Sequence, residues 1–196
     1  MEYPEKIFKI DHLEGISEKQ IEEHLKLYSG YVKHTNLIFE KIATLSKDPD
    51  NNAYVISELR RRFGFEFNGM RMHEYYFEEF VEGPKEADKD SELSKILSEK
   101  YGSVNSAMEY MEDVALTRGI GWMVLCYDSI AKTPYVVWVG DHELGQLGGL
   151  SVIMVLDMWE HAFMVDYTPS EKKKYIRSFF NNLNWKVPEN RFRGIM

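Results

Sequence analysis

The feature that most restricts how this chain can fold is a run of large apolar residues that stops at a carboxylate. Residues Val152 to Leu156 are all apolar, Asp157 follows them, and His161 comes four positions later. Such a run favours a strand that is buried on both faces, because a strand with one face in water would alternate apolar and polar residues. A carboxylate at the end of this strand and an imidazole on the next turn can point into one space. The sequence therefore predicts half of a metal site at Asp157 and His161.

The composition is that of a globular protein, with 44% hydrophobic residues and a net charge of −8. This charge disfavours a nucleic-acid partner, which needs clustered cations. No apolar stretch reaches the roughly 20 residues that span a bilayer, and Met1–Gly15 lacks the apolar core of an export signal. The single cysteine, Cys126, excludes an internal disulfide and a cysteine-based zinc site. We expect Cys126 to be buried in a strand and the protein to be cytoplasmic, without membrane or nucleic-acid partners.

A helical hairpin is predicted for the first half of the chain. A capping box at Ser17–Gln20 starts a long amphipathic helix that ends near Asp48, and a second helical region covers about 53–81, with a break expected at Gly64 or Gly69. His24 lies on the apolar face of the first helix, and His73 lies on the apolar face of the second. In an antiparallel hairpin these two histidines can approach each other.

The second half of the chain changes pattern and predicts a mixed domain. Helices are expected over residues 91–101 and 103–118, with the latter ending at Gly119, and strands over 121–127, 135–139 and 152–156. The first two strands form a hairpin with a long loop, and helices over 160–167 and 169–182 close the chain. The predicted fold class is α+β: an N-terminal antiparallel helical hairpin, residues 1–84, followed by a C-terminal α/β domain, residues 85–196, with a three-stranded antiparallel sheet. The metal site lies between them.

Four side chains form the predicted ligand set: His24, His73, Asp157 and His161. Three neutral imidazoles and one carboxylate suit iron or manganese, and zinc would accept them too. His12 and His34 lie on polar faces and are expected at the surface.

Several other metal and catalytic sites lack support in the sequence. Glu-x-x-His and His-Glu-x-x-His are absent, which disfavours a di-iron bundle and the usual zinc-peptidase helix. A Gly-x-Ser-x-Gly elbow is also absent, so a serine hydrolase is not supported.

The C-terminal half contains a series of motifs in a distinctive order. Asp157-Met-Trp-Glu-His-Ala162 is close to the signature Asp-x-Trp-Glu-His-Ala. It occurs with Gly-Ile-Gly-Trp at 119–122, Tyr127-Asp128, Asp166-Tyr167, Tyr175-Ile176, Asn184-Trp185 and Arg191-Phe192. In order and approximate spacing, this series resembles the iron/manganese superoxide dismutase family across Tyr101–Phe192.

The resemblance implies a function and a role for each site residue. The activity would be disproportionation of superoxide at one Fe or Mn ion per subunit, bound by the four predicted ligands. Trp122 and Trp159 would form the walls of the site. Glu160 would reach the partner's metal site in a homodimer, which could assemble further into a tetramer.

The chain departs from the family pattern at three positions around the site. Tyr28 stands where the first helix usually has a second histidine, and Tyr31 comes one residue before the usual gateway tyrosine. We assign the gateway role to Tyr31, with Tyr28 as its neighbour. His142 falls where the family has a glutamine that holds the metal-bound solvent, and the same role is expected of it.

The altered first helix keeps two other functions open. One is a metal-binding relative of the same fold that does not dismutate superoxide, and the other is a zinc-dependent hydrolase. Dismutase assays after iron or manganese loading distinguish both from the enzyme.

Overall fold

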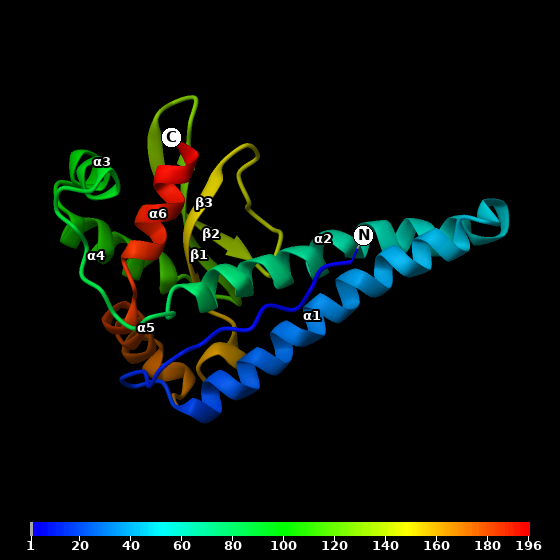
Figure 1. The fold of residues 1–196 in the computed structure, drawn as a ribbon, viewed down its shortest axis with the longest axis horizontal. Coiled ribbons are helices and arrows are strands. Elements are labelled where there is room, and N and C mark those ends of the chain that lie inside the picture. Colours follow the sequence, from blue (N-terminus) through cyan, green and yellow to red (C-terminus); the bar gives the residue numbers. More distant parts are fainter. Residues whose placement is uncertain (1) are drawn as a thin grey trace.

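Two long antiparallel helices, α1 (Glu18–Leu45) and α2 (Pro49–Glu78), form the first half of the structure, a computed structural model that describes residues 2–196. The Ser17 side chain caps α1 by accepting a hydrogen bond from the Gln20 amide at 3.1 Å. Figure 1 shows this hairpin projecting beyond the rest of the molecule, with the N-terminal segment running beside it. The predicted helical hairpin is confirmed.

The second helix differs from the prediction because it begins at Pro49 and continues without a break through Gly64 and Gly69. A proline fits the first turn of a helix, where its missing N–H is not needed. A glycine inside a helix costs only about 1 kcal/mol relative to alanine, which packing can offset. At Gly69 the packing is explicit: a Cβ built there would lie 2.6 Å from the ring of Tyr31. The glycine therefore allows Tyr31 to cross the hairpin.

The predicted three-stranded antiparallel sheet is confirmed, with strand order β2-β1-β3. It consists of β1 (Gly121–Asp128), β2 (Thr133–Gly140) and β3 (Ser151–Asp157). In the central strand, Trp122 pairs with Val139 on one side and with Asp157 on the other. Most residues of β1 and β3 are buried. The carboxylate of Asp157 at the end of β3 therefore lies away from solvent. Cys126 is also buried, as predicted.

The hairpin between β1 and β2 has a shorter loop than predicted. The strands extend to Asp128 and Thr133, and the side chain of Asp128 accepts hydrogen bonds from the amides of Ile130 and Ala131. This short polar side chain replaces backbone pairing inside the turn, which is the usual reason that aspartate occurs there. Only residues 129–132 therefore separate the two strands.

Helices surround the sheet and join it to the hairpin. They are α3 (Glu92–Tyr101), α4 (Val104–Ala115), α5 (Lys172–Asn182) and α6 (Lys186–Ile195), with short 3-10 turns η1 (Glu160–Ala162) and η2 (Pro169–Glu171). α4 packs on β1 and β2, while α2 and α6 both pack on β3 (Figure 1). The α+β fold class is confirmed. The division into units 1–84 and 85–196 stays a prediction.

Three predicted helices in the second half have different bounds in the structure, and one helix was not predicted. α4 ends at Ala115 and not at Arg118, α5 starts only after η2, α6 was not predicted, and the helix expected over 160–167 is the single turn η1. In the segment 160–167, the side chain of Gln20 takes the place of the backbone hydrogen bond that would join His161 and Val165 in a helix. Its side chain donates to the His161 carbonyl at 2.6 Å and accepts from the Val165 amide at 3.0 Å. These two bonds anchor the segment after β3 to the start of α1.

One buried hydrogen-bonded pair, Arg191 and Glu79, connects three elements. The Arg191 side chain on α6 donates to Glu79 Oε1 at 2.6 Å and to the Ile153 carbonyl at 3.0 Å. Glu79 follows the end of α2 and accepts a second hydrogen bond from the Val155 amide at 3.1 Å. The pair therefore links α2, β3 and α6. Among residues 2–196, none of the helices combines the length and apolar character needed to cross a membrane.

Candidate metal centre

The helical hairpin supplies two of the four predicted ligands. His24 on α1 and His73 on α2 are fully buried, and their ring centroids are 4.9 Å apart. The His73 Nδ1 lies 2.6 Å from the Gly69 carbonyl oxygen, so Nδ1 carries the proton and Nε2 is the free acceptor. A hydrogen bond of this kind orients a metal-binding imidazole and fixes its tautomer.

The end of β3 and the following turn supply the other two. The Trp159 amide donates to Asp157 Oδ1 at 2.8 Å, and the Tyr175 hydroxyl donates to the Asp157 carbonyl at 2.8 Å. These bonds fix the carboxylate and leave Oδ2 directed at the histidines. His161 follows on η1, where its carbonyl is held by Gln20.

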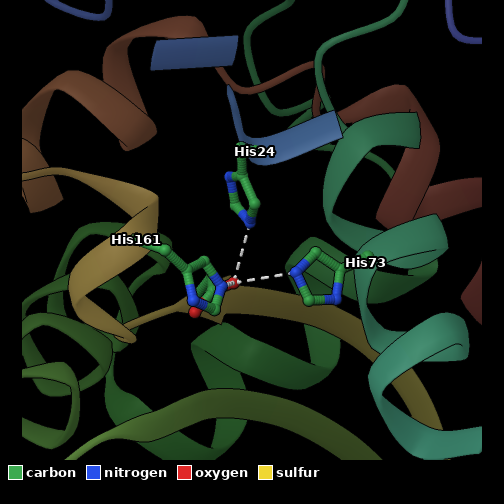
Figure 2. Close-up of side chains that lie close together, drawn as sticks. His24, His73 and His161 are labelled. Atoms are coloured by element: carbon green, nitrogen blue, oxygen red, sulfur yellow. Dashed lines mark hydrogen bonds and ion pairs between the residues drawn. The ribbon is translucent and has the colours of Figure 1, made fainter. Parts of the chain in front are cut away.

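Three imidazole nitrogens converge on the same carboxylate oxygen (Figure 2). The Nε2 atoms of His24, His161 and His73 lie 3.0, 3.3 and 3.6 Å from Asp157 Oδ2. One donor atom from each of the four residues fits within 4.8 Å of the others. Ligands about 2.1 Å from one ion and at right angles are about 3.0 Å apart, so this spacing suits a first-row metal.

The buried polar atoms of the cluster also fit a metal ion. His73 Nε2 is buried and has no hydrogen-bond partner among residues 2–196, although it faces the Asp157 carboxylate. A buried acceptor without a partner is costly in a folded protein. A cation bound between the four side chains would satisfy this nitrogen.

The electrostatics of the cluster favour the protonation states that bind a cation. Burial lowers the pKa of His24 and lowers that of His73 well below its ordinary value, so both imidazoles stay neutral. Burial alone would raise the pKa of Asp157, but His161 and His24 outweigh it and the pKa is lowered. Neutral imidazoles and an ionised carboxylate are the forms that coordinate metals.

A second layer of hydrogen bonds lies beside the ligands. The indole Nε1 of Trp122 donates to His142 Nδ1 at 3.0 Å, and His142 Nε2 lies 2.8 Å from the Tyr31 hydroxyl. An indole N–H can only donate, so His142 carries its proton on Nε2 and donates it to the Tyr31 oxygen. Burial lowers the pKa of His142 to about 4, which keeps the ring neutral. The proton of the Tyr31 hydroxyl is then free to be donated elsewhere.

Aromatic rings surround His142. Trp159 stacks on it with ring centroids 4.8 Å apart, and Phe65 meets it edge-on at 4.6 Å. Trp159 is held by a hydrogen bond from its indole to the Asp141 carbonyl at 3.1 Å. Phe65 was not predicted from the sequence. Its position two helical turns before His73 on the same helix was the available signal.

Two of the predicted site residues lie apart from this network. The hydroxyl of Tyr28 donates to Glu74 at 3.3 Å and accepts from the Lys6 amide at 2.9 Å, so it is not on the path from Tyr31 to His142. Burial raises the pKa of Tyr28 to about 12. Glu160 is exposed on the surface of the single chain. The pocket role of Tyr28, the dimer bridge of Glu160 and the solvent-holding role of His142 stay predictions.

Comparison with known proteins gives one consistent result. The sequence profile described as iron/manganese superoxide dismutases, C-terminal domain, matches residues 89–191. Over 98% of its length the chain is 32% identical to an iron superoxide dismutase of Aquifex aeolicus, covering 92% of that protein. The identity is 29% to an iron superoxide dismutase of Methanothermobacter marburgensis, over 97% of this chain and 95% of the relative. It is 27% to one of Sulfolobus acidocaldarius, over 98% and 93%.

Proposed function

Because the chain belongs to the iron/manganese superoxide dismutase family, we propose that it disproportionates superoxide at a single iron or manganese ion. His24, His73, Asp157 and His161 would hold this ion. The convergence of three Nε2 atoms on Asp157 Oδ2 is the observation that carries the proposal. In the overall reaction, two superoxide ions and two protons give one dioxygen and one hydrogen peroxide.

When bound, the metal supplies one-electron chemistry by alternating between its trivalent and divalent states. The negative charge of Asp157 lowers the net charge of the site and favours the trivalent state. The fully buried surroundings of Asp157 and His73 exclude water and strengthen these interactions. Iron is the first metal to test, since the relatives are named iron superoxide dismutases.

Peroxide formation consumes protons, and Tyr31 is the proposed donor. Its oxygen accepts from His142, so its own O–H can point to a superoxide-derived oxygen in the site. Burial raises the pKa of Tyr31, with further contributions from Asp157 and Glu66, so the hydroxyl stays protonated in neutral solution. His142 and Trp122 position this hydroxyl and complete the wall with Trp159.

We also propose a homodimer in which Glu160 reaches the partner's metal site; a tetramer is the further possibility to test. Exposure of Glu160 next to the ligand His161 supports this proposal. The single cysteine supports a proposed cytoplasmic location. The change in composition near residue 84 supports a proposed division into two units, 1–84 and 85–196.

Dismutase assays on protein loaded separately with iron, manganese and zinc test the function. We expect activity with iron or manganese, none with zinc, and loss of metal in the His161→Ala variant. The matched control is His12→Ala, which removes an exposed histidine outside the proposed ligand set. Stoichiometric iron and manganese without activity would instead identify a metal-binding relative that is not a dismutase.

A further inference from the structure

A cation lies on the solvent side of the aromatic wall. The guanidinium carbon of Arg62 is 3.7 Å from the centroid of the Phe65 ring, which is in turn 4.6 Å from the His142 ring and 6.2 Å from the Tyr31 ring. The Arg62 side chain is 49% exposed. One aromatic ring therefore separates this charge from the hydrogen-bonded pair beside the candidate metal centre.

The rim of the site consists of four half-buried side chains, and Arg62 stacks on one of them, Phe65. The side chains of Tyr31, Phe65, Trp159 and His161 are all half-buried, whereas His24, His73 and Asp157 are fully buried. Phe65 lies 6.4 Å from Trp159, and Trp159 stacks on His161 at 5.6 Å. These four half-buried rings lie between the solvent and the fully buried ligands.

The guanidinium is held from one edge only. Its Nε donates to Glu66 Oε1 at 2.8 Å, and the other Glu66 oxygen lies 3.7 Å from His34 Nδ1. Glu66 is buried, so its charge lies behind Arg62 as seen from solvent. The two Nη groups of Arg62 make no hydrogen bond to any of residues 2–196. The face of the guanidinium thus lies on the Phe65 ring, and Glu66 binds only its Nε edge.

The charge of Arg62 also reaches the polar pair inside the rim. Burial is the main cause that raises the pKa of Tyr31 and lowers the pKa of His142, and Arg62 acts to lower both. This matters in a chain of net charge −8, whose overall field repels small anions. A local cation at a cleft can reverse that effect and raise the association rate of an anion.

We propose that Arg62 is a specificity-determining residue, which steers small anions over the edge of Phe65 into the site. The identity of that anion as superoxide rests on the proposed function. Arg62 acts on approach and does not contact the reacting atoms. Its effect must therefore weaken with salt, since the Debye length falls from about 30 Å at 0.01 M to about 3 Å at 1 M ionic strength.

Two single substitutions with the same change in net charge test the proposal. Arg62→Gln removes the rim cation, while Arg61→Gln removes its neighbour in the chain, which is 70% exposed and pairs with Glu58. For the iron-loaded protein, the measurements are kcat/KM for superoxide and the association rate constant of azide, a small anion that reports by absorbance. We expect Arg62→Gln to lower both by about threefold at low ionic strength, with the difference gone at high salt. Arg61→Gln should stay close to wild type.

Arg62→Lys separates charge from stacking, because lysine keeps the charge without the planar guanidinium. Near-normal rates in Arg62→Lys support steering, whereas rates as low as those of Arg62→Gln would assign Arg62 to the packing of Phe65 and overturn the proposal. Equal rates for Arg62→Gln and Arg61→Gln in an active enzyme would also overturn it. If the wild type is inactive but azide binds more slowly to Arg62→Gln, the dismutase function fails while the steering stands.

Discussion

At the scale of single residues, the hydrogen bonds beside the metal site follow from one side chain, Trp122, whose indole can only donate. Trp122 can only donate, which makes His142 accept at Nδ1 and donate at Nε2. The usual glutamine of the family has two N–H donors on one nitrogen, whereas an imidazole in this tautomer has one N–H. With His142 engaged by Tyr31, the tyrosine hydroxyl becomes the group with a proton available to the site.

Replacing His142 with alanine should leave the metal bound, because His142 is outside the proposed ligand set. Activity should fall by about 10- to 100-fold, as is typical when a residue that supports a metal site is lost. His142→Gln should retain more activity, since a glutamine amide can accept from Trp122 and donate to Tyr31. Metal analysis and superoxide kinetics on both variants check this. Loss of the metal in His142→Ala would contradict it.

Gly69→Ala should destabilise the protein and disturb the Tyr31–His142 hydrogen bond. The new Cβ would lie 2.6 Å from the Tyr31 ring, and overpacking of this kind costs about 1–3 kcal/mol. The matched control is Gly30→Ala on α1, where a Cβ meets nothing within 4 Å and a gain of up to about 1 kcal/mol is expected. Urea unfolding of both variants measures the difference, and equal stabilities would refute the packing argument.

At the scale of elements, the sequence predicted what local signals control and failed where distant side chains decide. Ser17, Ser91 and Ser103 each cap a helix, and the cap at Ser17 was predicted because capping depends on the next three residues alone. The four proposed ligands were likewise selected from their places on buried faces, and the structure brings one donor atom of each within 4.8 Å of the others. The helix expected over 160–167 failed because Gln20, distant in sequence, occupies its backbone groups.

Two other features of the site could not be predicted for the same reason. Phe65 and Arg62 belong to the rim only through their contacts with a loop residue, His142, and with each other. Arg62 and Phe65 are three residues apart on α2, so their own contact follows from helix geometry, whereas the contact of Phe65 with His142 has no signature in local sequence. Gly69 looked like a helix break, and only the ring of Tyr31 from the other helix explains it.

The junction of α2, β3 and α6 predicts a dependence of stability on pH. Burial raises the pKa of Glu79 to about 8, and Arg191 only partly offsets this. A carboxyl group whose pKa rises from about 4.3 in the unfolded chain favours folding fully at low pH. Its contribution is lost as pH rises through 8.

Glu79→Gln, which cannot ionise, should therefore gain stability relative to wild type as pH rises from about 5 to 8. Urea unfolding of the metal-loaded proteins at several pH values gives the difference directly. Glu82→Gln, near Glu79 in sequence but exposed, is the control and should show no such trend. A constant difference across this range would mean that Glu79 is ionised in the folded protein throughout.

At the scale of the whole molecule, the proposed ligands join the helical hairpin to the sheet and the segment after it. His24 and Asp157 are separated by 133 positions, and their side chains meet at 3.0 Å. A metal bound here would therefore hold distant parts of the chain together. Ligand binding to the folded state alone stabilises it by about 2.7 kcal/mol at 100 times the Kd.

Removal of the metal should lower the melting temperature, and the metal-free protein should itself lose stability in acid. The pKa values of His24 and His73 are lowered in the folded protein by burial. Their contribution to stability is complete above the unfolded value of about 6.5 and is lost as pH falls below it. Thermal unfolding of metal-free and metal-loaded protein from pH 8 to 5 checks both effects. Equal melting temperatures with and without metal would contradict the proposed site.

The long separation between the ligands also has a consequence for synthesis of the chain. During translation, α1 and α2 emerge with His24 and His73 long before Asp157 and His161 leave the ribosome. Translation at about 5–20 residues per second leaves the two imidazoles without their carboxylate for several seconds. A metal captured in that interval would meet only half of its ligands and exchange readily. At the proposed site, the choice between iron and manganese would therefore be made late, after β3 has docked on the helical hairpin.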